Sequence, residues 1–265
     1  MILPLPLIAL LLGLVEGITE FLPISSTGHL ILVGRLCGLT GARAEVFEIF
    51  IQLGAVVAVV VEYRARLLEV ARGLVRSRME RSFAMSVAVA FLPAVGIGLV
   101  THHWISEHLF GPRTVAAALV AGAIAILAIE RLKPAPTIDR ADRVGPARAA
   151  LIGLAQCVSL WPGFSRSAAT ILGGLLCGLE RKAATEFSFF LAIPTLGAAT
   201  IYDLWKKHDA LVPGDLLWLL VATAISFVVA WASIRWLLRF VATHDLTPFA
   251  WYRIVLGLLV WTSVG

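Results

Sequence analysis

The chain has 265 residues, of which 59% are hydrophobic and 15% are charged. A soluble globular domain is about 45–50% apolar and about 25% charged, so this composition excludes an ordinary soluble enzyme, a disordered chain and a coiled coil. The net charge of +5 comes from basic clusters between apolar segments, which follows the positive-inside rule and predicts no nucleic-acid partner. We therefore expect an all-α integral membrane protein that crosses the lipid bilayer several times.

The first apolar segment, residues 1–38, is interrupted near its middle. Glu16, Glu20, Pro23 and the polar run at residues 25–27 separate two apolar pieces, each long enough for one short helix. Non-helical backbone at membrane depth is tolerated only where it is buried in protein or lines a wet cavity. This pattern predicts a re-entrant helical hairpin.

Three predicted crossings follow, at residues 49–61, 82–101 and 114–129. A membrane helix needs about 20 residues, so the first and third of these segments must extend into their flanks. Two long basic loops, residues 64–81 and 131–148, lie two crossings apart. Both can therefore lie in the cytoplasm, as the positive-inside rule requires.

Residues 149–180 form a second interrupted segment. Gln156, Pro162, Gly163 and the polar run at residues 165–167 divide it, which predicts a second re-entrant hairpin.

Three more crossings are predicted after it, at residues 187–202, 216–234 and 246–265. The last of these spans the bilayer only if Arg253 is paired or faces the protein interior.

The two interrupted segments match each other at a constant shift of 140 residues. The matched pairs include Gly13 with Gly153, Glu16 with Gln156, Ser25 with Ser165, and Thr27 with Ser167. We interpret the chain as one membrane domain, residues 1–265, built from a first repeat at 1–132 and a second at 141–265.

Each repeat is one hairpin followed by three crossings, and an odd number of crossings inverts the second copy. The expected fold has about six transmembrane helices and two re-entrant hairpins that enter from opposite faces. Inverted repeats with broken helices place their site near the membrane midplane, where the interrupted segments meet.

Glu16 and Glu20 lie four residues apart and share one face of a helix. Ionisable residues inside a membrane are functional candidates, and two neighbouring carboxylates can share a proton, hold a divalent cation, or act as an acid and a base. The alternative is a pair at a water-exposed helix end.

Ser25, Ser26 and Thr27 lie where the N-cap of the second half-helix is expected, and free amides there can bind an anion. His29 follows Ser26 by three residues, so a hydroxyl and an imidazole can meet as a nucleophile and its base. The alternative is that the serine only caps the helix and the histidine only bonds a carbonyl.

The second break offers an anion site built from different residues. Gly163 permits backbone geometry closed to other residues, and Ser165, Ser167 and Thr170 supply hydroxyl groups. Arg166 has a planar fork that fits phosphate oxygens, and at membrane depth it must face an anionic ligand or the carboxylates of the first break. The alternative is an arginine that reaches the membrane surface.

Glu48 and Gln52, also four residues apart, can line the same cavity or simply mark a helix end. The acids come from one hairpin and the arginine from the other, which suits a phosphoester substrate.

Four stretches together resemble the undecaprenyl-diphosphate phosphatases, the bacitracin-resistance family. Residues 16–30, EGITEFLPISSTGHL, resemble the first family signature, and residues 162–170, PGFSRSAAT, resemble the second. Residues 47–55 and 186–194 are also similar to family stretches. The resemblance covers essentially the whole chain.

The resemblance implies hydrolysis of undecaprenyl diphosphate to the monophosphate carrier lipid and inorganic phosphate for cell-wall synthesis. By motif position, Glu16 and Glu20 are the acidic pair and the natural ligands of a divalent cation, Mg²⁺ or Ca²⁺. Ser26 and His29 are the nucleophile and its partner, and Arg166 is the phosphate clamp. The resemblance also implies the bacterial inner membrane and a site that opens to the extracytoplasmic side; a homodimer is left open.

Two alternatives remain at this level. Water activated by Glu20 can replace Ser26 as the nucleophile. A carrier of lipid phosphate or of anions would share the architecture, because transporters are built from inverted repeats with broken helices. A carrier, however, needs no nucleophile beside its anion site.

Overall fold

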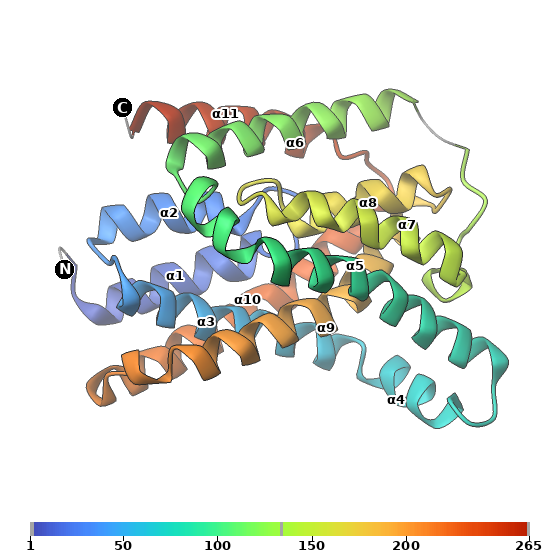
Figure 1. Ribbon diagram of the computed structural model, residues 1–265, viewed down its shortest axis with the longest axis horizontal. Coiled ribbons are helices and arrows are strands. Elements are labelled where there is room, and N and C mark those ends of the chain that lie inside the picture. Colours follow the sequence, from blue (N-terminus) through green and yellow to red (C-terminus); the bar gives the residue numbers. More distant parts are fainter. Residues whose placement is uncertain (1–2, 133–134, 264–265) are drawn as a thin grey trace.

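The computed structural model describes residues 3–132 and 135–263, and the chain is helical through most of them (Figure 1). An isolated bridge between Ile138 and Leu179 is the one β contact in these ranges. The helices are α1 Leu5–Thr19, α2 Ser26–Cys37, α3 Ala42–Glu62, α4 Arg64–Gly73, α5 Arg78–His108, α6 Pro112–Leu132, α7 Pro146–Gln156, α8 Arg166–Leu176, α9 Arg181–Lys206, α10 Leu216–Val241 and α11 Thr247–Ser263. The all-α prediction is confirmed.

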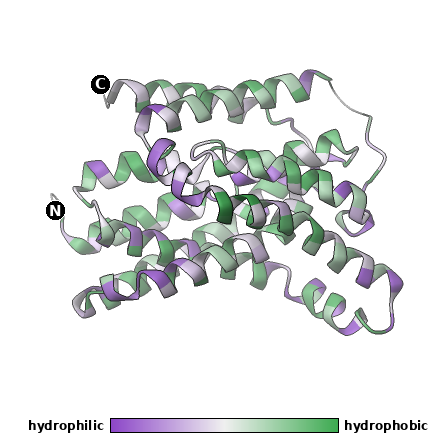
Figure 2. Ribbon diagram, in the orientation of Figure 1, coloured by the Kyte–Doolittle hydropathy of each residue, from purple (hydrophilic) through white to green (hydrophobic). Residues whose placement is uncertain are grey.

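Five helices, α3, α5, α6, α9 and α10, are long and apolar enough to cross a membrane. The 17-residue α11 lies alongside α6 (Figure 1). Figure 2 shows hydrophobic residues along most of the length of these helices. The chain is therefore a multi-pass membrane protein.

The helices extend beyond the apolar windows that predicted them. Each of the six predicted crossings lies within one helix, except that Leu246 precedes α11 and residues 264–265 fall outside the described ranges. At the start of α5, for example, the Ser77 side chain accepts a hydrogen bond from the Glu80 amide at 3.3 Å. Capping of this kind lets a helix begin in its charged flank, before the apolar run.

The basic segment 64–81 was expected to be a loop, but its first half forms the helix α4. Arg, Ala, Leu and Glu are good helix formers. Leu67 and Val70 pack against the core, while Arg66 pairs with Glu80 at 2.7 Å. Packing on one side and an ion pair on the other stabilise this short helix.

Both interrupted segments form helical hairpins. α1 and α2 flank the first break, while α7, the short 3₁₀ turn Cys157–Leu160 and α8 flank the second. In Figure 1 the first pair lies on the left and the second on the right, with their breaks toward the middle. The two predicted hairpins thus have the expected arrangement.

The two breaks share one unusual backbone geometry. Ser25 has φ 71° and Ser165 has φ 77°, and they are the non-glycine residues with positive φ in the described chain. This conformation is costly for a residue with a Cβ. Each serine also caps the next helix, because its Oγ accepts from the amide three residues later.

Glycines at matched positions let each hairpin pack closely on the other half of the chain. A Cβ on Gly13 would lie 2.7 Å from the Ala222 carbonyl oxygen of α10, and one on Gly153 would lie 2.4 Å from the Ala90 carbonyl oxygen of α5. These paired contacts fit an inverted repeat, whose boundaries stay a prediction.

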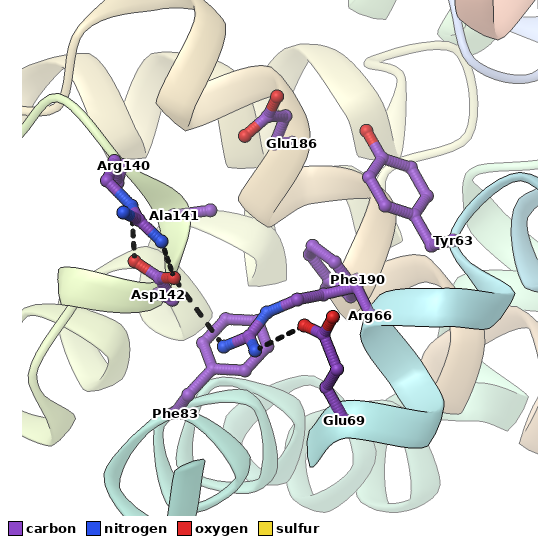
Figure 3. Close-up of a pocket in the computed structure, with 9 residues that line it drawn as sticks. All are labelled: Tyr63, Arg66, Glu69, Phe83, Arg140, Ala141, Asp142, Glu186 and Phe190. Atoms are coloured by element: carbon purple, nitrogen blue, oxygen red, sulfur yellow. Dashed lines mark hydrogen bonds and ion pairs between the residues drawn. The ribbon is translucent and has the colours of Figure 1, made fainter. Parts of the chain in front are cut away.

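The two basic segments lie at the same end of the molecule. Arg66 of α4 and Asp142 of the second segment approach to 3.5 Å, and Arg140 pairs with Asp142 at 2.6 Å. They border a cavity of about 300 Å³ with Tyr63 and Glu186 on its wall (Figure 3). None of the predicted site residues lines this cavity.

Candidate active site

The two breaks are joined directly by a hydrogen bond from a side chain of one to the backbone of the other. Ser167 Oγ, at the start of α8, donates to the Leu22 carbonyl oxygen in the first break at 2.9 Å. Ser165 Oγ and Ser167 Oγ also lie 2.9 Å apart. Both serines are buried. The expectation that the interrupted segments meet is therefore confirmed.

Glu20 links the two hairpins through its side chain. It caps the C-terminus of α1 and is buried. Its Oε2 accepts from Ser26 Oγ at 2.7 Å, and its Oε1 accepts from Arg166 Nη2 at 3.2 Å. One carboxylate thus holds a hydroxyl from its own hairpin and a guanidinium from the other.

Arg166 faces the protein interior and not the membrane surface. Its side chain is 9% exposed and pairs with Glu20. Nη1 donates to the carbonyl oxygen and the hydroxyl of Ser188, at 3.1 and 3.3 Å. Its guanidinium carbon lies 5.6 Å from the centre of the Phe21 ring. Nε is buried without a hydrogen-bond partner in the described chain.

Thr170 supports this arrangement from one turn further along α8. Its Oγ1 lies 2.6 Å from Ser188 Oγ and donates to the Arg166 carbonyl oxygen at 2.9 Å. Ser188, in α9, was not singled out by the sequence reasoning. The sequence gives little sign of its role, because a serine in an apolar helix commonly forms its hydrogen bond within its own helix.

Glu16 lies one turn before Glu20 and is 2% exposed. Its Oε2 has no hydrogen-bond partner among the described residues. Its electrostatic neighbours are Glu20, Glu48 and Arg166. A buried carboxylate oxygen with no donor suits either a proton or a cation.

A divalent cation at this site would need ligands from the substrate as well as from the protein. No group of three or more His, Cys, Asp or Glu side chains in the described ranges could hold a metal. Mg²⁺, however, is commonly bound by one or two carboxylates together with substrate phosphates and water. The free oxygen of Glu16 and the neighbouring carboxylate of Glu20 fit that mode.

His29 does not form the expected contact with Ser26. Its Nδ1 lies 2.7 Å from the Ser25 carbonyl oxygen, and its Nε2 lies 2.6 Å from Tyr252 Oη. Because a carbonyl only accepts, Nδ1 carries the proton, and Nε2 accepts from the tyrosine hydroxyl. The imidazole bonds back to the carbonyl four residues earlier, while Ser26 Oγ turns to Glu20.

The other predicted residues have varied positions. Ser25 caps α2, and Gly163, with φ 100°, lies so close to α6 that a Cβ would be 2.5 Å from the Val115 carbonyl oxygen. Thr27, at the start of α2, is half-buried.

Glu48 and Gln52, the other predicted pair, lie on α3 and have different surroundings. Gln52 Oε1 accepts from Thr200 Oγ1 at 3.0 Å and links α3 to α9. Glu48 is exposed, one turn before Gln52 on α3, and is an electrostatic neighbour of Glu16.

Arg253 faces the protein interior, which was the condition for its apolar segment to cross the membrane. It is fully buried in α11 and donates to four backbone carbonyl oxygens. The sequence required that it be paired or face the protein interior but could not name these partners.

Fold and site together define a multi-pass helical membrane protein in which two broken helices bring acidic, hydroxyl and guanidinium groups together in the interior. Residues 9–259 match the family model described as "Bacitracin resistance protein BacA". The chain belongs to this family, as its two motifs predicted.

Similar proteins are found in several bacteria. The undecaprenyl-diphosphatase of Dechloromonas aromatica (strain RCB) is 52% identical over 252 residues, which cover 95% of this chain and 92% of that protein. That of Aromatoleum aromaticum is 50% identical over 258 residues, 97% and 94% of the two chains. That of Cupriavidus metallidurans is 46% identical over 284 aligned positions, 98% and 97%.

Proposed function

We propose that this protein hydrolyses undecaprenyl diphosphate to undecaprenyl phosphate and inorganic phosphate. The reaction recycles the carrier lipid for peptidoglycan synthesis and confers bacitracin resistance. Family membership and the names of the relatives support this activity. The observation that carries it is the continuous hydrogen-bonded chain from Ser26 through Glu20 to Arg166.

In the proposed first step, Ser26 Oγ attacks the terminal phosphorus and Glu20 Oε2 takes its proton. The bond from phosphorus to the bridging oxygen breaks, and undecaprenyl phosphate leaves with that oxygen and its electron pair. A group positioned to accept the hydroxyl proton is the usual activation of a serine nucleophile. The 2.7 Å distance between these two oxygens supports Glu20 as the base in place of His29.

In the second step, water attacks the phosphoserine and phosphate is released. Glu20 returns its proton to Ser26 Oγ, and both protons of the attacking water stay on the phosphate, which leaves as dihydrogen phosphate. Direct attack by water activated by Glu20 is the alternative route.

Arg166 holds the equatorial phosphoryl oxygens through its free Nε and its fork of N–H groups. Ser165, Ser167, Thr170, Ser25, Thr27 and Gly163 shape the surrounding anion pocket. Glu16 and Glu20 would hold Mg²⁺ or Ca²⁺, which neutralises charge on the phosphoryl oxygens when bound. Stabilisation of developing charge is commonly the largest catalytic term in reactions of this type.

We further propose that the protein lies in the bacterial inner membrane with its site open to the extracytoplasmic side. The two basic segments share one end of the molecule, which the positive-inside rule assigns to the cytoplasm. The first hairpin then enters from the opposite face. A homodimer stays a hypothesis, which the mass of the detergent-solubilised protein tests.

Phosphate release from undecaprenyl diphosphate by the purified protein in detergent tests the activity. We expect turnover that falls when a chelator removes divalent cations. A protein that binds the lipid but releases no phosphate would refute the enzyme and favour a carrier.

A further inference from the structure

Arg253 lies in the middle of α11, and no part of its side chain reaches solvent. Its Nε donates to the Leu119 carbonyl oxygen at 3.1 Å, and its Nη2 donates to the Ala118 carbonyl oxygen at 3.2 Å. Both acceptors belong to α6. No acidic side chain in the described chain forms an ion pair with it, so backbone dipoles stabilise this buried charge.

Its other two bonds reach the two hairpin breaks. Nη1 donates to the Pro23 carbonyl oxygen and Nη2 donates to the Gly163 carbonyl oxygen, both at 3.1 Å. Pro23 and Gly163 are 140 residues apart, the shift that also relates the two capping serines Ser25 and Ser165. One guanidinium therefore holds the equivalent carbonyl of each repeat.

These carbonyls lie close to the reacting groups along the chain. Pro23 precedes Ser26 by three residues, and Gly163 precedes Arg166 by three. Because carbonyls in non-helical backbone have no partner within a helix, they need a donor at membrane depth. The bonds to Arg253 therefore satisfy one backbone carbonyl in each break and fix the separation of the two breaks.

We propose that Arg253 is a positioning residue that locks the two breaks together and so sets Ser26 and Glu20 against Arg166. The effect on turnover rests on the proposed function, whereas the effect on hairpin position does not. A planar fork suits this role, because its three nitrogens donate to four carbonyls, whereas a lysine ammonium offers three donors from a single atom.

Gly122 of α6 supplies the space for this fork. A Cβ at this position would lie 2.0 Å from Arg253 Nη2 and 2.7 Å from its Cζ, whereas a Cβ on Gly96 of α5 would meet nothing within 4 Å. Gly122→Ala therefore displaces the guanidinium without removing it. Gly96→Ala is the matched control, since it places the same methyl group in another membrane helix.

The direct test measures the distance between the hairpins by double electron–electron resonance. Spin labels on cysteines at Leu36 and Leu176, exposed at the far ends of α2 and α8, report their separation after Cys37, Cys157 and Cys177 are changed to alanine. We expect a shifted or broadened distance distribution for Arg253→Gln, Arg253→Lys and Gly122→Ala, and an unchanged one for Gly96→Ala. A purely stabilising role would lower the melting temperature without changing this distribution in the folded protein.

Kinetics test the consequence for catalysis. Misplacement of reacting groups by about 1 Å can cost about 100-fold in rate, so we expect kcat to fall by about that factor in Arg253→Gln and Arg253→Lys. KM should change only a few-fold, because Arg166 remains on its own hairpin.

Each result has a distinct meaning. An unchanged distance distribution in folded Arg253→Gln or Gly122→Ala, or full recovery of kcat by lysine, would overturn the positioning role. If the wild-type protein releases no phosphate, the proposed function fails, and the distance measurement still decides the role of Arg253.

Discussion

Replacement of Glu20 by glutamine tests the central contact of the site. The change keeps the size of the side chain but removes the charge that pairs with Arg166, whose side chain is 9% exposed. It also leaves one carbonyl oxygen where two carboxylate oxygens now accept from Ser26 and Arg166. The amide nitrogen must then face one of these donors.

Two effects should follow, and their magnitudes differ. Removal of one partner from a buried ion pair costs about 3–5 kcal/mol. We expect the lower end, about 3 kcal/mol, because Ser188 still accepts two hydrogen bonds from Arg166. Loss of a general base lowers turnover by about 10²- to 10⁴-fold.

Thermal unfolding in detergent and phosphate release from undecaprenyl diphosphate measure the two effects separately. Glu107→Gln is the control, because this glutamate is 57% exposed and among the described residues its one ion pair is with His103; its loss should cost less than about 1 kcal/mol. Glu20→Gln combined with Arg166→Gln should be more stable than Glu20→Gln alone, since no uncompensated charge remains. A Glu20→Gln protein with wild-type stability and turnover would refute the reasoning.

Three further predictions concern the neighbouring groups. Arg166→Lys should still fold and insert but lose most of its turnover, because lysine keeps the charge without the fork; near-wild-type turnover would remove Arg166 from the phosphate site. Glu16→Gln should weaken the cation dependence of turnover, measured by titration of Mg²⁺ into chelated protein, and a wild-type enzyme indifferent to the chelator would contradict a metal role for Glu16. Tyr252→Phe removes the hydroxyl that donates to His29, and a lost hydrogen bond of about 0.5–1.5 kcal/mol predicts a several-fold fall in phosphate release. A loss of several orders of magnitude would instead place His29 among the groups that transfer protons.

Much of this architecture is readable from the sequence because membrane depth restricts what polar residues can do. Proline, glycine and hydroxyl residues inside apolar segments predicted the two breaks. An arginine at the second break needed an anionic partner, and the acidic pair of the first break was the available one. The contact between Arg166 and Glu20 follows from that constraint.

The contacts that were not predicted depend on side-chain direction and on distant helices. The spacing of Ser26 and His29 allows them to meet, but spacing does not fix rotamers, and each side chain bonds a different partner. Tyr252 lies 223 residues from His29, and Ser188 lies on the helix after that of Arg166, so no pattern within one helix relates either to its partner. The same holds for the four carbonyls that Arg253 holds, because backbone acceptors leave no signal in residue type.

The most direct test of the account compares Ser26→Ala with Ser25→Ala, two adjacent serines with different roles. Ser25 caps α2 through a long 3.5 Å bond, so its loss should cost about 1 kcal/mol, or several-fold in rate. Ser26 donates to Glu20 and is the proposed nucleophile, so its loss should lower phosphate release by several orders of magnitude. If Ser26→Ala keeps more than about a tenth of wild-type turnover, a difference of about 1.4 kcal/mol, the serine is not the nucleophile and water activated by the glutamates replaces it.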